Sequence, residues 1–169
     1  MPSEASGFDQ HAGAADRAAD AAALDALRAA LAAMPPVAAM QLAVVGYDGV
    51  RLRTSAPLAP NVNDKGCAFG GSLNSLMTIT AWGLCFLRLH ASGVRADTFV
   101  QDSSIRYLAP LYADLEAEAW MAADSDAAAF ASQLRLRGRA RAQLAARVLL
   151  PDGADAATFH GRFVALRSG

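Results

Sequence analysis

Lysine and cysteine are nearly absent from this chain. Among its 169 residues there is one lysine, Lys65, against fourteen arginines, and the excess of arginine and alanine extends over the whole sequence. We therefore attribute that excess to coding bias rather than to function. The two cysteines, Cys67 and Cys85, are too few and too far apart to indicate a disulfide framework or a zinc site. Reduced, partly buried thiols are expected, and they favour a cytoplasmic protein.

A strong net charge is also missing. Fifteen Lys and Arg residues stand against sixteen Asp and Glu, which leaves a net charge of −1. This balance predicts no general affinity for nucleic acid or acidic lipid. The N-terminus has no basic stretch followed by a leucine-rich run, so no signal peptide is expected. No cluster of ligands suggests a metal.

Apolar periodicity predicts one domain over residues 17–169, preceded by a disordered tail over 1–16. A helix is expected over 17–34, where Leu24, Leu27 and Leu31 share one face, and the following prolines end it. A helical turn is expected in the connector 124–134. Strands are predicted over 40–47, 49–58, 98–108, 112–122, 135–150 and 156–166.

A long apolar segment from Gly71 to about His90 separates the second and third of these strands. About 20 residues of helix span about 30 Å, and a helix that is apolar on all sides is buried in protein or membrane. Asn74 and Thr78 interrupt the run and no second span follows, which disfavours a membrane span. The expected fold is α+β: an antiparallel sheet of about six strands wrapped around one hydrophobic helix, the hot-dog arrangement, with an N-terminal helix. Such a sheet leaves an edge that a second copy can cover, so a homodimer or a dimer of dimers is expected.

A specific motif precedes the long helix. The stretch SAPLAPNVNDKGCAFGGSLNSL, followed by WGLCFL, resembles the thioesterase domain found alone or at the C-terminus of YiiD-type acetyltransferases. GRARAQLAARVLL and FHGRFVAL fit the same family, and the likeness covers about residues 35–167. More distantly, the spacing of Asn63, Gly66 and Gly70-Gly71 is similar to acyl-CoA thioesterases with Asn-x-x-Gly-x-x-His-Gly-Gly. The resemblance implies a hot-dog thioesterase acting on acyl-CoA or acyl-carrier-protein thioesters, with no cofactor other than the coenzyme A of the substrate.

Thioester hydrolysis must stabilise negative charge that develops on the carbonyl oxygen. Free N–H groups at a helix N-terminus provide donors with a suitably oriented dipole. Gly70 and Gly71 would let the thioester approach the backbone. From the related thioesterases, Asn63 is expected to donate to the carbonyl or to hold a water. Phe69, Ser72 and Asn74, together with Gly70, are the expected substrate-binding residues, and Gly71 and Asn63 belong to the expected catalytic set.

A general base is missing from the pattern. Phe69 stands where the related thioesterases have histidine, and Thr78 stands where they often carry Asp or Glu. No acidic residue occurs between residues 65 and 96. The candidates that remain are Asp64 in the loop, Asp102 on the next strand, which could come from a partner subunit, and Thr78, which could orient water but is a poor base.

Each candidate also has a purely structural interpretation. Asn63 and Asp64 are common turn and cap residues, and Thr78 could bond back to a helix carbonyl. Cys67 has no histidine near it in sequence and is interpreted as an inert thiol. An alternating arginine run predicts the solvated face of a strand, or alternatively a surface that attracts coenzyme A phosphates. The run consists of Arg135, Arg137, Arg139 and Arg141.

The sequence thus predicts a metal-independent acyl thioester hydrolase. The alternative is a non-catalytic acyl-CoA-binding module, which the missing helix carboxylate favours. A dehydratase or hydratase comes third, because it would need a histidine beside a carboxylate. None of His11, His90 and His160 is placed for that role.

Overall fold

The computed structural model describes the backbone of residues 7–168 and the side chains of residues 19–168. The helices are α1 (Gly7–Ala32), α2 (Pro35–Ala39), α3 (Gly70–Ala91) and α4 (Ala127–Arg137), with a 3-10 turn η1 (Ala59–Asn61). The strands are β1 (Ala43–Tyr47), β2 (Leu52–Ala56), β3 (Ala96–Tyr107), β4 (Leu115–Met121), β5 (Arg139–Leu149) and β6 (Asp155–Arg167).

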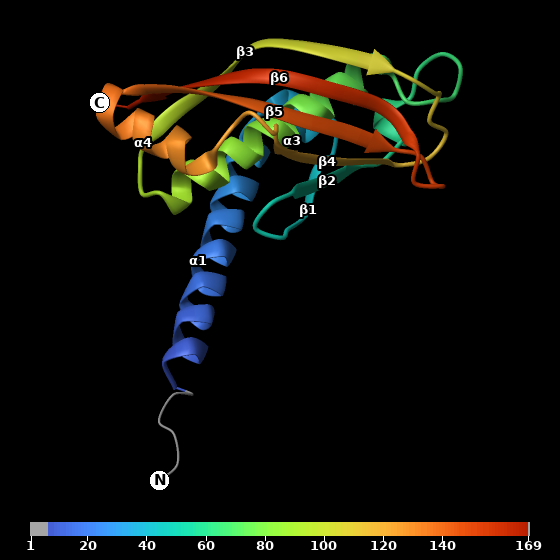
Figure 1. The fold of residues 1–169 in the computed structure, drawn as a ribbon. Helices are drawn as coiled ribbons and strands as arrows, with labels where there is room; N and C mark the ends of the chain where they lie inside the picture. The colour runs from blue at the N-terminus through green and yellow to red at the C-terminus, as the bar shows by residue number, and fades with distance from the viewer. Residues whose placement is uncertain (1–6, 169) are drawn as a thin grey trace.

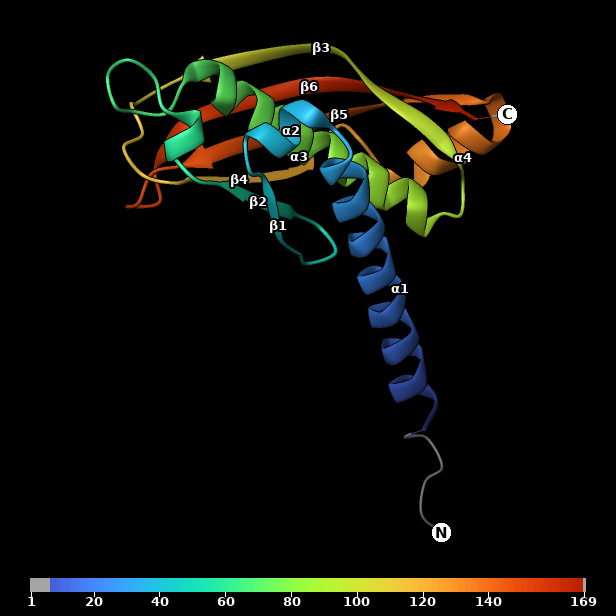
Figure 2. The ribbon, with the colours of Figure 1, turned by 180° about the vertical axis from the view of Figure 1, so that it is seen from behind.

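All six strands form one antiparallel sheet in the order β1-β2-β4-β5-β6-β3. The long strands β3, β5 and β6 curve over α3, which packs against the inner face of the sheet (Figures 1 and 2). This arrangement confirms the predicted α+β hot-dog fold with an N-terminal helix. Within residues 7–168, no helix has the length and hydropathy needed to cross a membrane.

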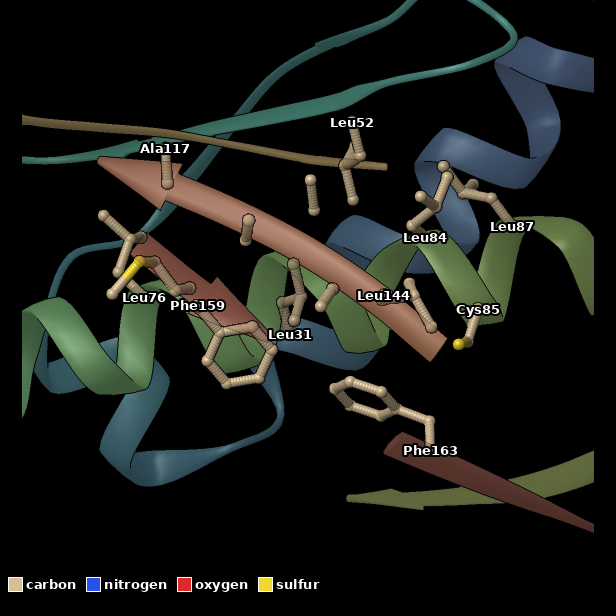
Figure 3. Packing of buried hydrophobic residues seen from close by; sticks show 14 of the residues in the cluster. Leu31, Leu52, Leu76, Leu84, Cys85, Leu87, Ala117, Leu144, Phe159 and Phe163 are labelled. Carbon is tan, nitrogen blue, oxygen red and sulfur yellow. The ribbon is translucent and has the colours of Figure 1, made fainter. Parts of the chain in front are cut away.

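The core lies between α3 and the sheet. Leu76, Met77 and Leu84 of α3 are fully buried and belong to one core cluster with Phe159 and Phe163 of β6. Figure 3 shows part of this cluster. The two phenylalanines point to the same face of the sheet because they lie four residues apart, and alternate residues of a strand share a face. Burying a side chain of this size contributes about 1.5–3 kcal/mol relative to leaving it exposed.

Helix α1 starts earlier than the sequence suggested. It begins at Gly7, whereas a disordered tail was expected up to residue 16, and residues 1–6 of that tail lie outside the described residues. Leu27 and Leu31 are buried as expected, and Leu24 is half-buried. The N-terminal part of α1 extends away from the sheet, so the helix contacts the domain through its C-terminal half (Figures 1 and 2).

The predicted strand over 135–150 was wrong at its start. Its first residues form the end of α4, and β5 begins only at Arg139. Gly138 causes the change because it adopts a left-handed conformation, with φ of 69°, and its N–H donates to the Leu134 carbonyl at 2.9 Å. At the other end of α4, Asp126 caps the helix by accepting a bond from the Ala128 N–H at 2.9 Å.

Candidate active site

A tight loop connects η1 to α3. The Asn63 N–H donates to the Cys67 carbonyl at 2.8 Å, and Gly66 turns the chain with a φ of +80°. The Phe69 N–H donates to the Asn61 carbonyl at 2.7 Å. These backbone bonds place Phe69 directly before the first turn of α3.

The Asn63 side chain holds this loop together. Its Oδ1 accepts bonds from the N–H groups of Lys65 at 2.8 Å and Cys67 at 3.3 Å, and its Nδ2 donates to the Cys67 Sγ at 3.2 Å. Such an Asx turn satisfies the loop backbone locally. Asn63 is therefore positioned to orient the loop, and its direct contact with a substrate stays a prediction.

The N-terminus of α3 has no cap. Phe69 adopts an extended conformation there and provides no side-chain hydrogen bond. Within the described part of the chain, the N–H groups of Gly70, Gly71 and Ser72 have no acceptor. These three donors stand at the positive end of a 22-residue helix, where a negatively charged oxygen is stabilised.

Two aromatic rings flank the two glycines. A Cβ on Gly71 would lie 2.3 Å from Cε1 of Phe69, and a Cβ on Gly70 would lie 3.4 Å from Cε1 of Tyr107. The Tyr107 hydroxyl donates to the Gly70 carbonyl at 3.1 Å. Tyr107 was not among the residues predicted from the sequence. Its position at the end of the strand that follows the helix was the only signal that could have indicated a role at this site. We call the free donors with these two rings the α3 corner.

The two candidate carboxylates lie apart from one another. Asp64 has a side chain that is 80% exposed, and its oxygens contact the Lys65 Nζ at 2.8 and 3.0 Å. Asp102 lies on β3 opposite Arg162, with 3.5 Å between Oδ2 and Nη1. Cross-strand partners share a face, and Arg162 alternates with the buried Phe163, so Asp102 lies on the outer face of the sheet, away from α3. One protomer therefore does not bring Asp102 to the α3 corner.

Thr78 and Asn74 form a pair one turn apart on α3. The Thr78 hydroxyl donates to the Asn74 Oδ1 at 3.2 Å, and both side chains are half-buried. The bond back to a helix carbonyl that was considered for Thr78 is instead made by Thr80, whose Oγ1 lies 2.6 Å from the Leu76 carbonyl. The Thr78 oxygen keeps acceptor capacity with which it could orient a water.

A mostly apolar groove of about 630 Å³ lies further along α3. It runs between α1, the C-terminal half of α3 and the start of β3, and its walls include Met34, Trp82, Phe86 and Phe99. The Trp82 Nε1 donates to the Thr98 carbonyl at 2.9 Å, which fixes this wall to β3. We call this the aromatic groove.

The cysteines show no sign of nucleophilic activation. Burial raises the pKa of the Cys85 thiol to about 12, because the thiolate would lose its hydration. Cys67 is also buried and accepts the Asn63 amide. Among residues 19–168, no three His, Cys, Asp or Glu side chains gather where they could hold a metal ion.

Comparisons with known proteins agree with the fold and identify a family. Residues 24–167 match the family described as "Putative thioesterase (yiiD_Cterm)". A crystal structure described as a putative thioesterase from Shewanella oneidensis is 32% identical, with a TM-score of 0.76, covering 85% of this chain and 97% of that one. A protein of unknown function from Chlorobaculum tepidum TLS is 26% identical, with a TM-score of 0.78, covering 88% and 94%. The E. coli PaaI protein is 16% identical over 87% and 94%, with a TM-score of 0.61, and it shows the fold alone.

Proposed function

This chain belongs to the YiiD C-terminal thioesterase family, and from that premise we propose that it hydrolyses acyl thioesters of coenzyme A or acyl carrier protein. The observation that carries the proposal is the α3 corner, where the N–H groups of Gly70, Gly71 and Ser72 are free to bind an oxygen atom. A thioester carbonyl at this corner would find donors for its oxygen in both the ground state and the tetrahedral intermediate. Donors that are already in place need no reorganisation as charge develops.

The reaction then requires one activated water. The water oxygen attacks the carbonyl carbon while a base takes one of its protons, and collapse of the intermediate breaks the C–S bond. The released thiolate takes up a proton to give free coenzyme A or carrier thiol. Asp64, Thr78 and Asp102 of the partner subunit remain the candidate groups for water activation, and Asn63 would hold the loop from which the carbonyl is bound.

We propose a homodimer formed through β3, which would act in the cytoplasm. β3 is an edge strand of twelve residues, and residues 99–104 are exposed on both faces of the sheet. Phe99 and Val100 are 53% and 45% exposed. A long open edge offers unpaired backbone groups to another strand, and β3 of a second copy is the matching partner. Dimers could pair again into a tetramer.

A non-catalytic acyl-CoA-binding module is the second candidate. It is favoured by the position of Asp102, which lies on the outer face of its own protomer, and by the contact of Asp64 with Lys65. Such a module would use the same corner and groove for binding but would lack an activated water.

Release of free thiol from a panel of acyl-CoA substrates tests the hydrolase. We expect turnover by the wild type and a loss of about 100-fold or more in kcat/KM for Gly71→Val, because a branched side chain would block the oxyanion donors. Ala29→Val on the exposed surface of α1 is the matched control and is expected to keep full activity. Saturable acyl-CoA binding without turnover above that of an Asn63→Ala variant would refute the hydrolase and leave the binding module.

A further inference from the structure

The end of the molecule opposite the α3 corner carries a group of three arginines. Arg95, Arg135 and Arg167 line a pocket of about 360 Å³, which we call the arginine pocket. Residues 92–94 and Ser168 complete its wall. Among the side chains of residues 19–168, none of these three guanidiniums has a carboxylate oxygen within 4 Å.

Backbone carbonyls hold two of the arginines in place. The Arg135 Nη2 donates to the Ser92 carbonyl at 2.7 Å, and the Arg167 Nη1 donates to the Arg135 carbonyl at 3.3 Å. Each guanidinium has five N–H donors, so most of them stay available in an ordered position. A planar fork of donors fits a phosphate group with two parallel hydrogen bonds.

One acidic side chain lies close to the pocket. Asp97 belongs to the adjoining aromatic groove, and its Oδ2 accepts a bond from the Ser168 hydroxyl at 3.2 Å. Of the described residues that line the pocket and the groove, Asp97 is the acidic one and the three arginines outnumber it, and Asp97 already accepts a bond from a neutral group. The local charge stays positive and favours a ligand with more than one negative charge.

The arginine pocket continues into the aromatic groove. The two share Val94, Arg95 and Ser168, and the groove beyond them is lined by Trp82 and Phe86, whose rings lie 5.6 Å apart. The combined depression has an apolar channel that ends in a cluster of positive charges. Its shape and charge fit a ligand with a long, mostly uncharged arm and several phosphates at one end.

We propose that the arginine pocket binds the phosphate groups of coenzyme A in the thioester whose carbonyl lies at the α3 corner of the partner subunit. The aromatic groove would then hold the pantetheine arm. This proposal rests on the thioesterase function and on pairing through β3, and it selects acyl-CoA over acyl carrier protein as the substrate.

Reach excludes the α3 corner of the same protomer. Gly71 and Ser92 are separated by 21 residues of helix, or about 31 Å at 1.5 Å per residue. An extended chain advances about 1.2 Å per bond, so the roughly thirteen bonds from the sulfur of coenzyme A to its nearest phosphorus span about 16 Å. A thioester bound at Gly71 cannot place its phosphates in the arginine pocket of the same chain.

Pairing through β3 brings the two features together. β3 starts beside Arg95 and ends at Tyr107, whose hydroxyl contacts Gly70. In an antiparallel pair about a twofold axis near the middle of the strand, the start of one β3 lies opposite the end of the other. Such a pairing would turn the arginine pocket of one subunit toward the α3 corner of its partner, which is the arrangement that the reach of the pantetheine arm requires.

Substrate preference tests the pocket. The double variant Arg95→Gln/Arg167→Gln is compared with Arg28→Gln, an exposed arginine on α1. Because these arginines would bind phosphate directly, we expect at least about a tenfold fall in the preference for acyl-CoA over the same acyl group on N-acetylcysteamine, which lacks phosphates. Arg28→Gln should keep the wild-type preference. An unchanged preference in the double variant would overturn the proposal.

Calorimetric titration with coenzyme A separates this proposal from the proposed function. Weaker coenzyme A binding by the double variant than by the wild type supports the pocket, whether or not any thioester is hydrolysed. If neither thioester is hydrolysed, the hydrolase is refuted and the pocket is not. Unchanged coenzyme A affinity together with slower turnover of acyl carrier protein would overturn the proposal and assign the arginines to an acidic carrier.

Mixed dimers test the contribution of the partner. One protomer carries Gly71→Val and the other carries Arg95→Gln/Arg167→Gln. If the site is shared, one of the two sites in the mixed dimer has an intact corner and an intact pocket, so the low KM of the wild type returns. If each site is built from one chain, no site is intact, and the high KM that results would overturn the shared site.

Discussion

Glu118 on β4 lies on the outer face of the sheet, yet its side chain is only 8% exposed. Arg51 and Arg147 each approach its Oε1 to 2.6 Å, and the Nε of Arg53 lies 3.7 Å from Oε2. The guanidiniums of Arg51 and Arg147 also lie 4.7 and 5.9 Å from the Trp120 ring centroid. The hydrogen bond to Glu118 raises the pKa of Arg147 above its ordinary value. The Glu118 carboxylate on β4 thus forms ion pairs with Arg53 on β2 and with Arg147 on β5.

Removing this carboxylate should destabilise the protein. Glu118→Ala would leave the arginines close together without a counter-charge. Breaking a buried pair costs about 3–5 kcal/mol, and because the arginines are a third or more exposed, we expect about 1–3 kcal/mol here. Urea unfolding measures the loss. The control is Glu116→Ala, an exposed residue on the same strand and face, and an equal loss in both variants would contradict the prediction.

Residues that are close in sequence were easier to assign than residues that meet only in the fold. The Gly70-Gly71 pair and the start of the long helix are local features, and the structure places them where the sequence indicated. Tyr107 reaches Gly70 across 37 positions, and no periodicity reports such a contact. Glu118 alternates along β4 with inward-facing alanines, and its burial depends on arginines from other parts of the sheet.

At the scale of elements, hydrophobic periodicity located each long helix and strand, whereas their ends depended on single residues. The start of β5 was misplaced because arginine and leucine alternate through Gly138, and only its positive φ shows that a helix ends there. Helix α1 was found from its leucine stripe, since those side chains meet α3. Gly83 lets α3 pack closely against β2 and α1, because a Cβ at this position would lie 2.8 Å from Leu52 Cδ2 and 3.4 Å from Leu27.

Leu27 should account for much of the attachment of α1. It is fully buried, and we expect Leu27→Ala to lower the free energy of unfolding by about 2–5 kcal/mol through lost burial and a residual cavity. Asp25→Ala is the control, because Asp25 forms only an exposed pair with Arg28 at 2.9 Å, worth about 0–1 kcal/mol. Denaturant unfolding that shows no difference between the two variants would mean that α1 adds little to the stability of the domain.

At the scale of the whole molecule, the sequence predicted six strands and one buried helix but not the order of the strands. That order depends on pairings between distant segments, such as β2 with β4 and β3 with β6. The open edge of β3 could not be recognised either, because Phe99, Val100 and Ile105 are typical of a strand in any position. The general base stayed unassigned for a related reason, since a carboxylate from a second subunit, one of the proposed candidates, would leave no pattern near Gly71.

The β3 edge provides the last prediction. The wild type should sediment at twice the monomer mass of 17.5 kDa, or at four times that mass where dimers pair again. Ser103→Lys/Ser104→Lys adds positive charges near the middle of β3, where two copies would meet across the twofold axis and repel. We expect this variant to sediment as a folded monomer and to lose most of its thioesterase activity, because each α3 corner would lack the arginine pocket of its partner. His160→Lys, exposed on β6 opposite Ser104, should stay dimeric. A monomeric wild type, or a variant that stays dimeric, would show that β3 is not the interface.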